Sequence, residues 1–567
     1  MKICYIWIER FRNFENFGFN LSSSQKFKYD SKINILSRVK IDPLPVNFFG
    51  DRIEDVVGII GKNGAGKSNA IELICKILKG AKTSLQTDFF VLVEIDGNIT
   101  CHYSFGNKAH PNADFRINFE EYSGNINPLK LVFFSNVFDE RNNDFDREVS
   151  DISVNKNFSR KSFFRKAEIT DFEKQISLIK SKIFPYLNIE LPTKVQLTSR
   201  VWTDRFSMTM NLNAPLRNND VIRNLKKTFR DRIRDIRPEN KLIHLLRFGY
   251  FFDFLNEISK RGRNTIYEYD IVLQDIENFI PQILNLRTEE ISERLIDFIE
   301  NLLDLSLQQI NLLPEKEKAK QIIANLEKFK KQTKFLKDLK YSKIDLEIKY
   351  NSEGSRNRNL EYFTFDYTSN SVKAFIIEFV SLFEQSNFFN INWLGISSGH
   401  KAYLNLFASI FQELKYTRQL NLLLCIDEGD LYLHPKWQIE FFDKLITVLP
   451  IFFSGRIQLI LTSHSPFLLS DLPNQNITIL GQSIDNSSLD GIDLSINTFG
   501  GNLYDLYSEP LFLGNKRMSD FSYKKIRDLI DSVENKKLSI QDKETFLRMA
   551  NLVGDEIIQY QIKKTLE

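Results

Sequence analysis

An eight-residue glycine-rich stretch constrains this chain more than any other feature: Gly61-Lys-Asn-Gly-Ala-Gly-Lys-Ser68. The apolar run Val56–Ile60 before it predicts a short buried strand, and the apolar periodicity of Ser68–Leu78 after it predicts a helix. This is the G-x-x-x-x-G-K-S/T pattern in the strand–loop–helix context that it requires. Because glycines let successive backbone N–H groups turn toward a phosphate, the sequence predicts a site for ATP or GTP.

The same stretch indicates which residues bind the nucleotide and its metal ion. Lys67 would reach the β- and γ-phosphates, and the Ser68 hydroxyl would bind Mg²⁺. The other contacts that we expect come from the loop and the first helical turn: Asn63, Gly64, Ala65, Gly66 and Asn69.

Composition predicts a soluble, cytoplasmic protein of two to four domains that does not contact a membrane. The chain has 567 residues, 42% of them hydrophobic and 26% charged, which is ordinary for globular proteins. Its four cysteines lie far apart without a C-x-x-C pair, so neither a disulfide framework nor a zinc site is expected. No apolar run approaches the ~18 residues that a membrane span needs, and the first residues lack the pattern of a secretory signal.

The pattern of strands and helices predicts an α/β fold, a two-lobed P-loop head with a long, mostly helical insert between the lobes. We expect lobe I at 1–145, the insert at 146–390, lobe II at 391–480 and a mixed, then helical, segment at 481–567. In lobe II the runs "LLLCIDE" and "IQLILTS" are typical of buried parallel strands. The strands expected in lobe I are Cys4–Ile8, Ile33–Leu36, Val56–Ile60, Phe89–Ile95, Thr100–Phe105 and Leu129–Phe134.

Two segments of the insert repeat apolar residues at heptad-like spacing. They favour a short antiparallel helical hairpin with a break near Pro314, although packing within a globular helical lobe explains the spacing equally well. The residues are Ile291, Leu295, Phe298, Leu302 and Leu305 in one segment, and Ile322, Leu326, Phe329, Thr333 and Leu336 in the other.

A basic zone lies in the same insert. Residues 151–240 hold 19 Lys and Arg against 10 Asp and Glu, whereas the whole chain carries a formal charge of only +3. Within it, residues 222–237 read as one helix with an apolar stripe and a row of basic residues beside it, which includes Arg230, Arg234 and Arg237. Arginine forks match phosphate oxygens, so nucleic-acid backbone is one candidate for this row. A protein partner or an intramolecular salt-bridge network is the other.

The second lobe contains acidic and polar residues that complete a nucleotide site. Asp427 and Glu428 follow the apolar run Leu422–Ile426, and they suit Mg²⁺ coordination and general-base activation of water, respectively. His464 ends the next apolar run, where its imidazole would donate to the γ-phosphate. The stretch "WLGISSGHKAYLNLFASI" from residue 393 opens another helix with polar residues, which gives a second anion-binding helix start.

The order of these motifs resembles that of the ATP-binding-cassette (ABC) ATPase family. In that family a signature motif, most often Leu-Ser-Gly-Gly-Gln, opens a helix that contacts the γ-phosphate of ATP held by a second head. The matching stretch here is "ISSGH", so the resemblance implies ATP contacts from Ser397, Ser398 and Gly399 and a dimer that encloses ATP and Mg²⁺. Ser398 and His400 depart from the usual glycine and glutamine, which puts the hydrolysis rate in question.

Two further loops of the family have weaker counterparts in this sequence. "LYLHP" at 431–435 falls at the position of the D-loop. No clear Gln-loop is present, and Asn136 in "FFSNVFD" stands where that glutamine is expected.

The motifs "DEGDLYLHP" and "TSHSPFLL" resemble the SMC, RecF and OLD branch of the family, which works on nucleic acid. The chain has no C-x-x-C for a zinc hook, and no Asp-x-Asp of a Toprim nuclease follows His464. "YIWIERFRNFENFGFNLSS" and "INTFGGNLYDLYSEPLFL" are most similar to PtuA, the ATPase of Septu-type anti-phage systems, some of them attached to retrons.

This resemblance implies an ATPase that assembles with itself and regulates a separate HNH-type, PtuB-like nuclease. Nucleic acid or a retron reverse transcriptase–DNA complex would be a further partner. Two alternatives stay open at this point: a RecF-like repair ATPase that acts directly on DNA, and a non-hydrolysing scaffold that ATP locks together.

Overall fold

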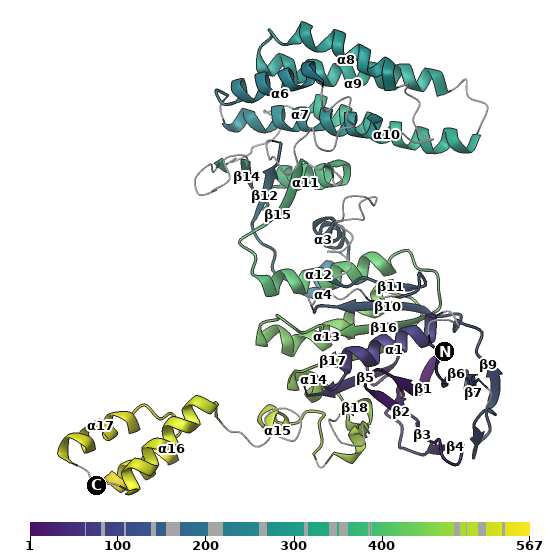
Figure 1. Cartoon of the computed structure of the whole chain (residues 1–567), viewed down its shortest axis with the longest axis vertical. Helices are drawn as coiled ribbons and strands as arrows, with labels where there is room; N and C mark the ends of the chain where they lie inside the picture. The colour runs from purple at the N-terminus through teal and green to yellow at the C-terminus, as the bar shows by residue number, and fades with distance from the viewer. Residues whose placement is uncertain are drawn as a thin grey trace.

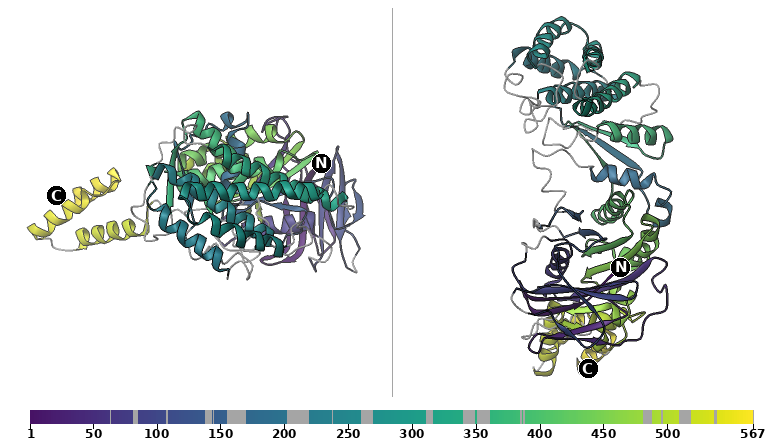
Figure 2. Two further views of the ribbon diagram at one scale, coloured as in Figure 1. Left: turned by 90° about the horizontal axis from the view of Figure 1, so that it is seen from above. Right: turned by 90° about the vertical axis from the view of Figure 1, so that its right-hand side faces the viewer.

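The structure is a tall molecule with an α/β head at its base, a narrow neck and a helical lobe at the top (Figure 1). Two further views show that the C-terminal helices stand to one side of the head (Figure 2). The computed structural model describes the chain except for residues 63, 81–84, 107–108, 138–142, 144, 155–169, 202–218, 237, 260–268, 311–315, 340–348, 351–360, 384–385, 387, 481–487, 495, 509–517, 536–538 and 567.

A seven-stranded sheet forms the centre of the head. Its neighbouring strands are parallel apart from the last pair. The central strands consist almost wholly of buried residues, as expected for a parallel sheet that is covered on both faces. In order across the sheet, the strands are β11 (Val149–Asp151), β10 (Lys130–Ser135), β16 (Asn421–Asp427), β17 (Arg456–Ser463), β5 (Ile53–Gly61), β18 (Ile477–Leu480) and β19 (Ser488–Asp490).

Alternate residues of these strands enter two different cores. Leu423 and Cys425 pack with helix α1 (Lys67–Lys79) and an antiparallel sheet, while Leu422 and Leu424 pack on the opposite face. That antiparallel sheet contains, in order, β2 (Phe14–Asn20), β1 (Lys2–Phe11), β6 (Phe89–Ile95), β7 (Asn98–Ser104) and β9 (Asn118–Glu121). The opposite face is covered by α12 (Ser398–Leu414), α13 (Pro435–Phe452) and α14 (Pro466–Asp471). A small outer sheet joins β3 (Lys26–Asp30), β4 (Ile35–Val39) and β8 (Asn112–Ala113).

The predicted α/β class is confirmed, and each of the six strands predicted in residues 1–145 overlaps an observed strand. Phe89–Ile95 agrees at both ends, and the helix predicted after the glycine-rich loop is α1. The local pattern of apolar residues in the sequence was therefore sufficient to predict these elements.

Five helices form the lobe at the top of Figure 1: α6 (Asp220–Ile233), α7 (Pro238–Ser259), α8 (Tyr269–Ile283), α9 (Thr288–Ile310) and α10 (Lys316–Asp338). Ion pairs join Lys330 to Asp304 at 3.4 Å and Lys337 to Asp297 at 2.9 Å, so α9 and α10 are antiparallel as predicted. The predicted break at Pro314 lies outside the described residues. Leu305 is 57% exposed, so its assignment to the apolar seam was wrong.

The helix predicted at 222–237 is α6, but it ends earlier than expected. Its apolar stripe is buried as predicted, whereas Arg234 caps the helix and Ile236 lies beyond it. Pro238 starts α7, and the residue before a proline is disfavoured in helical geometry, so the chain turns before this point.

The insert also contains a four-stranded antiparallel sheet that the sequence analysis did not predict. Its strands are β13 (Lys349–Tyr350), β14 (Glu361–Asp366), β12 (Lys194–Ser199) and β15 (Phe389–Leu394) in that order, and α11 (Asn370–Phe383) packs on it. The last strand, β15, crosses the expected boundary at residue 390 and leads directly toward α12.

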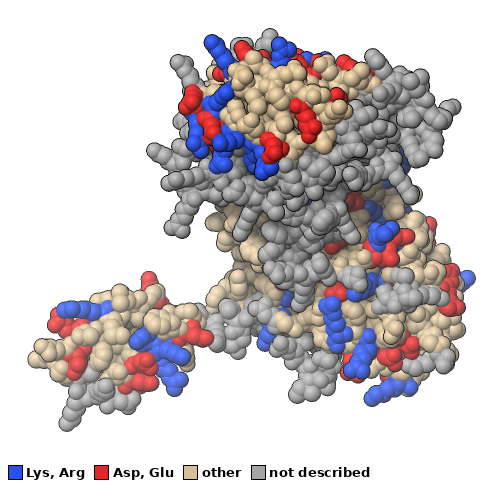
Figure 3. Space-filling model, turned by 45° about the horizontal axis from the view of Figure 1, so that its top comes forward, with Lys and Arg blue, Asp and Glu red and all other residues tan. Residues whose placement is uncertain are grey.

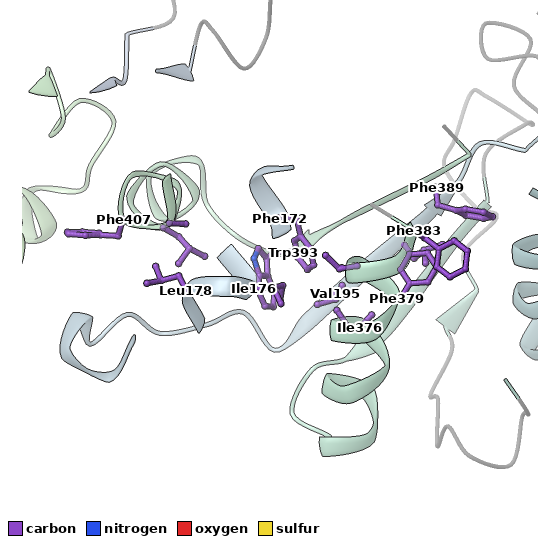
Figure 4. Packing of buried hydrophobic residues seen from close by; sticks show 14 of the residues in the cluster. Phe172, Ile176, Leu178, Val195, Ile376, Phe379, Phe383, Phe389, Trp393 and Phe407 are labelled. Carbon is purple, nitrogen blue, oxygen red and sulfur yellow. The ribbon is translucent and has the colours of Figure 1, made fainter. Parts of the chain in front are cut away.

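Buried hydrophobic side chains, among them Phe172 and Trp393, pack in the neck between this sheet and the head (Figure 4), and polar side chains add hydrogen bonds there. Helix α3 (Asp171–Ile179) packs against α12, and the short helix α4 (Phe184–Leu187) follows it. The Trp393 indole N–H donates to the Gln175 side-chain oxygen at 2.7 Å, and the Gln175 amide donates to Asn405 on α12. The Phe172 and Trp393 rings lie 5.2 Å apart between their centroids. The insert and the head are therefore joined through α12.

After α15 (Leu503–Ser508), the chain forms a separate helical unit. Its helices are α16 (Asp520–Asn535), α17 (Ile540–Ala550) and α18 (Glu556–Leu566). They share a small core of their own, made by Leu529, Val533, Ala550, Ile562 and Leu566. Among the described residues, no helix has the length and apolar character to span a bilayer.

Candidate nucleotide site

The candidate site lies at the carboxyl ends of three neighbouring parallel strands: β16, β17 and β5. The register places Asp427 beside Thr462 and Thr462 beside Ile59, next to the glycine-rich loop. Segments that are almost 400 residues apart in the sequence therefore meet at one edge of the sheet, which is where open α/β sheets bind ligands.

The glycine-rich loop leaves room for a phosphate chain at the start of α1. Gly66 has φ 95°, and a Cβ there would lie 2.4 Å from the Asn13 side-chain nitrogen, so a larger residue is excluded. Gly64 also has a positive φ, of 80°. No side chain in the described residues caps α1, so its first N–H groups are available to an anion. The predicted contact Asn63 lies outside the described residues.

Lys67 is held in the loop by backbone and imidazole acceptors. Its ammonium donates to the Gly61 carbonyl at 3.1 Å and lies 3.3 Å from Nδ1 of His464, while the residue is only 5% exposed. Burial lowers the pKa of Lys67, and the carboxylates of Glu428 and Asp427 oppose this shift. Its charge is thus placed where a bound phosphate would complete its surroundings.

His464 connects Lys67 to Glu428. Its Nε2 lies 3.1 Å from Oε1 of Glu428, on the other side of the ring from the lysine. A charged ammonium has hydrogens only to donate, so Nδ1 accepts and Nε2 carries the proton that is donated to Glu428. The three side chains therefore form one continuous line of hydrogen bonds across the site.

Asp427 is buried at the end of β16, where three hydroxyl groups surround its carboxylate. Thr462 Oγ donates to it at 2.6 Å, Ser135 Oγ donates at 3.3 Å, and the Ser68 side chain also bonds to it. Burial raises the pKa of Asp427, and the bonds from Thr462 and Ser68 oppose this shift.

The pair of Ser68 and Asp427 fits the metal predicted for this site. A hydroxyl and a carboxylate are oxygen ligands of the type that Mg²⁺ prefers, and this ion takes its other ligands from phosphates and water. In the described part of the chain, no group of three or more His, Cys, Asp or Glu residues could hold a metal by itself.

Glu428 directly follows Asp427 in the chain and has an unusual backbone conformation, with φ 48°. Its N–H donates to the Thr462 hydroxyl at 3.0 Å, which fixes this turn to β17. Its side chain is 17% exposed and faces His464, so a water molecule can reach the carboxylate. Glu428 is placed to accept a proton from such a water.

The residues predicted as the signature motif lie at the start of α12. Ser397 is the N-cap, and its hydroxyl accepts from the His400 N–H at 3.1 Å. A Cβ on Gly399 would lie 2.4 Å from the Tyr432 carbonyl oxygen, so the helix start packs tightly on the turn after Glu428. Ser398 is exposed beside them. Within the described residues, no hydrogen bond joins this helix start to the glycine-rich loop.

Asn136 forms hydrogen bonds beside the site, and His400 packs on an aromatic ring of α13. The Asn136 amide donates to the Leu431 carbonyl at 2.8 Å, and its N–H donates to the Asp427 carbonyl at 3.3 Å. This places Asn136 beside the site, and its role in place of the Gln-loop stays a prediction. His400 packs against the Trp437 ring at 5.2 Å between centroids, and burial lowers the pKa of this histidine.

Comparison with known proteins agrees with a nucleotide-hydrolysing head. Residues 199–470 match the family described as "AAA domain, putative AbiEii toxin, Type IV TA system". This segment includes Asp427, Glu428 and His464 and begins after the glycine-rich loop. The match covers less than half of the chain and shows a similarity to AAA domains.

A curated relative of this chain gives a more specific, but shorter, match. A protein of Vibrio cholerae serotype O1 biovar El Tor, described as "Retron Vc95 probable ATPase", is 36% identical over 83 residues. The aligned part spans 15% of this chain and 15% of that relative's length.

Three residues of the ATPase site were missed by sequence reasoning: Thr462, Arg12 and Asn13. Thr462 lies within an apolar strand, so only its pairing with Asp427 reveals its role. Arg12, in the turn after β1, donates to Asn69 at 2.7 Å and to Glu72 at 2.9 Å. Asn13 donates to the Ala65 carbonyl at 3.3 Å and so supports the loop. The polar dipeptide within "FRNF" was the only local signal for the last two.

The predicted nucleic-acid contacts lie elsewhere. Arg230 and Arg234 belong to α6 in the helical lobe, at the opposite end of the molecule from the head (Figure 1). Arg237 lies outside the described residues. Arg230 and Arg234 therefore take no part in the nucleotide site.

Lys67→Ala is expected to reduce ATP affinity at least a hundredfold, because the buried ammonium is the charge nearest to the phosphates. Isothermal titration with ATP and Mg²⁺ measures the effect. Lys62→Ala is the matched control, since Lys62 lies in the same loop but is exposed. Equal affinities of the two variants would contradict the assignment of the loop.

Thr462→Val is expected to lower ATP turnover about tenfold while ATP affinity changes little. Valine has nearly the shape of threonine but cannot donate to Asp427 or accept from the Glu428 N–H, so both acids lose an orienting contact. Steady-state hydrolysis and ATP titration separate the two effects. Thr545→Val, on the exposed side of α17, is the control, and wild-type turnover in Thr462→Val would rule out this positioning role.

Proposed function

We propose that the protein is an ABC-type ATPase that dimerises on ATP and Mg²⁺ and regulates a separate nuclease in defence against phage. The observation that carries this proposal is the line of contacts from Lys67 through His464 to Glu428. It joins a phosphate-binding cation, a hydrogen-bond donor and a base at one edge of the sheet, which are the groups that hydrolysis of a phosphoanhydride needs.

Each residue has a distinct task in this proposal. Lys67 and the N–H groups at the start of α1 bind and orient the phosphates, and Ser68 and Asp427 would hold Mg²⁺. The metal ion, when bound, neutralises phosphate charge and orients the β- and γ-phosphates. Glu428 accepts a proton from the attacking water. Before this transfer, His464 donates toward the γ-phosphate instead of Glu428, which leaves the carboxylate free to accept the proton.

The position of the signature residues supports a dimer. Ser397, Ser398 and Gly399 lie at the start of α12, where Ser397 accepts from the His400 N–H and Gly399 packs on the turn at Tyr432. A second copy can bring this helix start to the γ-phosphate and complete the site. Because α12 also contacts the neck, closure of such a dimer would be coupled to the insert.

The defence role rests on resemblance and on the two comparisons. The PtuA-like segments suggest an HNH-type, PtuB-like nuclease as partner, and the relative's description refers to a retron. ATP would set whether the nuclease is restrained or released, since open and closed dimers offer different contacts to it. A RecF-like repair ATPase is the second candidate, and the exposed basic residues of α6 favour it.

Glu428→Gln is expected to keep ATP affinity, to lower turnover at least a hundredfold and to accumulate the ATP-bound dimer, because an amide cannot accept the proton from water. Turnover assays and light scattering with ATP and Mg²⁺ measure these effects. Glu544→Gln, an exposed residue of α17, serves as the control. Wild-type turnover in Glu428→Gln would show that Glu428 is not the base, and the absence of turnover in the unmodified protein would favour the non-hydrolysing scaffold.

We expect the purified protein to hydrolyse ATP but to leave DNA and RNA intact, and to bind an HNH-type nuclease through the C-terminal unit. That unit exposes Leu552 by 86% and Ile557 by 72%, which suits a protein interface. The double variant Leu552→Asp/Ile557→Asp should lose co-purification with the nuclease. Leu420→Asp, at a 71% exposed leucine of the head, should keep it. Nuclease activity of the chain alone would contradict the proposal.

A further inference from the structure

The helical lobe carries a row of basic side chains whose role the ATPase head does not explain. Helix α6 turns one face into the lobe, where Ile222, Leu225, Phe229 and Ile233 are at most 1% exposed. The Phe229 ring stacks on that of Phe248, with 3.9 Å between their centroids. The rotation of α6 is thereby fixed, and the basic row cannot turn inward.

The basic row consists of Arg223, Lys227, Arg230 and Arg234. The Arg223 side chain is 60% exposed, and its bond to Asp220 on the same helix is a solvated pair that holds it only weakly. Lys227 and Arg234 are exposed, and Arg230 is half-buried. Figure 3 shows Lys and Arg side chains, with acidic ones between them, at the edge of the helical lobe where α6 lies.

A shallow polar cavity of about 620 Å³, wide open to solvent, lies at the carboxyl end of this row. One guanidinium nitrogen of Arg232 donates to the carbonyls of Leu284 and Leu286 at 2.9 Å and 2.7 Å, which fixes the α8–α9 turn beside α6. The cavity therefore has walls that are held in place. They are formed by Arg232, Asp235, Ile236, Asn240, Asn285, Leu286, Arg287, Thr288 and Glu289.

The row and the cavity differ in chemistry. The row presents cations at spacings of three to four residues along one helix, which suits successive phosphates of a polyanion. The cavity mixes donors such as Asn285 and Arg287 with the carboxylates of Asp235 and Glu289. Carboxylates repel phosphate, but together with amides they match the donors and acceptors on the edge of a nucleobase. A base can enter such a cavity only when it is unpaired.

We propose that this end of α6 binds single-stranded nucleic acid, with phosphates along the basic row and an unpaired base in the cavity. The site lies far from the nucleotide head and shares no residue with it, and we expect it to bind the strand without ATP. The inference therefore stands apart from the proposed regulation of a nuclease, and Lys67→Ala should bind the strand as well as the unmodified protein does.

The test uses the full-length protein, a fluorescent 20-nucleotide single-stranded DNA and its duplex, with anisotropy measured over a salt series. Lys227→Glu/Arg234→Glu should weaken single-strand binding at least tenfold and reduce the slope of log K against log salt by about 1.4, the value for two lost phosphate contacts. The matched control is Lys524→Glu/Lys525→Glu, a reversal of two exposed charges on α16.

Asn285→Leu tests the cavity without changing charge. It should weaken single-strand binding about fivefold and leave the salt slope unchanged, while the duplex binds at least tenfold more weakly than the single strand to the unmodified protein. Equal losses in the row variant and the control would overturn the proposal. So would equal binding of duplex and single strand, or unaltered binding by Asn285→Leu. Thermal unfolding of each variant confirms that the fold is retained.

Discussion

The burial of Asp427 is the constraint on which the rest of the head depends. A carboxylate in this position is costly unless hydrogen-bond donors surround it, and here they come from Thr462 on β17, Ser135 on β10 and Ser68 at the start of α1. These donors belong to three different elements. Their convergence requires the observed order of strands, and a slip of one residue would turn Asp427 or Thr462 to the opposite face of the sheet. The same strand register that provides the hydrogen-bond donors of Asp427 also brings Lys67, His464 and Glu428 together.

The neck connects the insert to the elements that hold Asp427 and Glu428 in the head. Only Gly395 and Ile396 separate β15 from the N-cap of α12, so the sheet of the insert and the signature helix are almost one continuous segment. The bonds from Trp393 to Gln175 and from Gln175 to Asn405 tie α3 to both. Displacement of the insert sheet would therefore move Gly399 relative to Tyr432. Tyr432 lies two residues after Asp430, in the turn that carries Glu428.

The sequence predicted those parts of the molecule that have a local signature. The glycine-rich loop, the buried strands and the apolar stripe of α6 repeat patterns that depend only on neighbouring residues. Thr462 and Arg12 have no such signature, because their partners are distant in the chain. The insert sheet was missed for the same reason, since β12 pairs with β15 almost 200 residues later. The end of α6 was misplaced because its apolar period continues to Ile236, while the restraint imposed by Pro238 overrides it.

The proposed dimer accounts for two features of the turn beside the start of α12. Gly399 must lack a side chain because the Tyr432 carbonyl occupies that space. Tyr432 itself has φ 67° and is 57% exposed, an arrangement that is strained for a large residue and unfavourable on an isolated surface. In the proposed dimer, a second copy would cover this surface and bring its bound phosphates to Ser397 and Ser398. Nucleotide binding and dimer closure would then stabilise each other, because each completes contacts that the other leaves open.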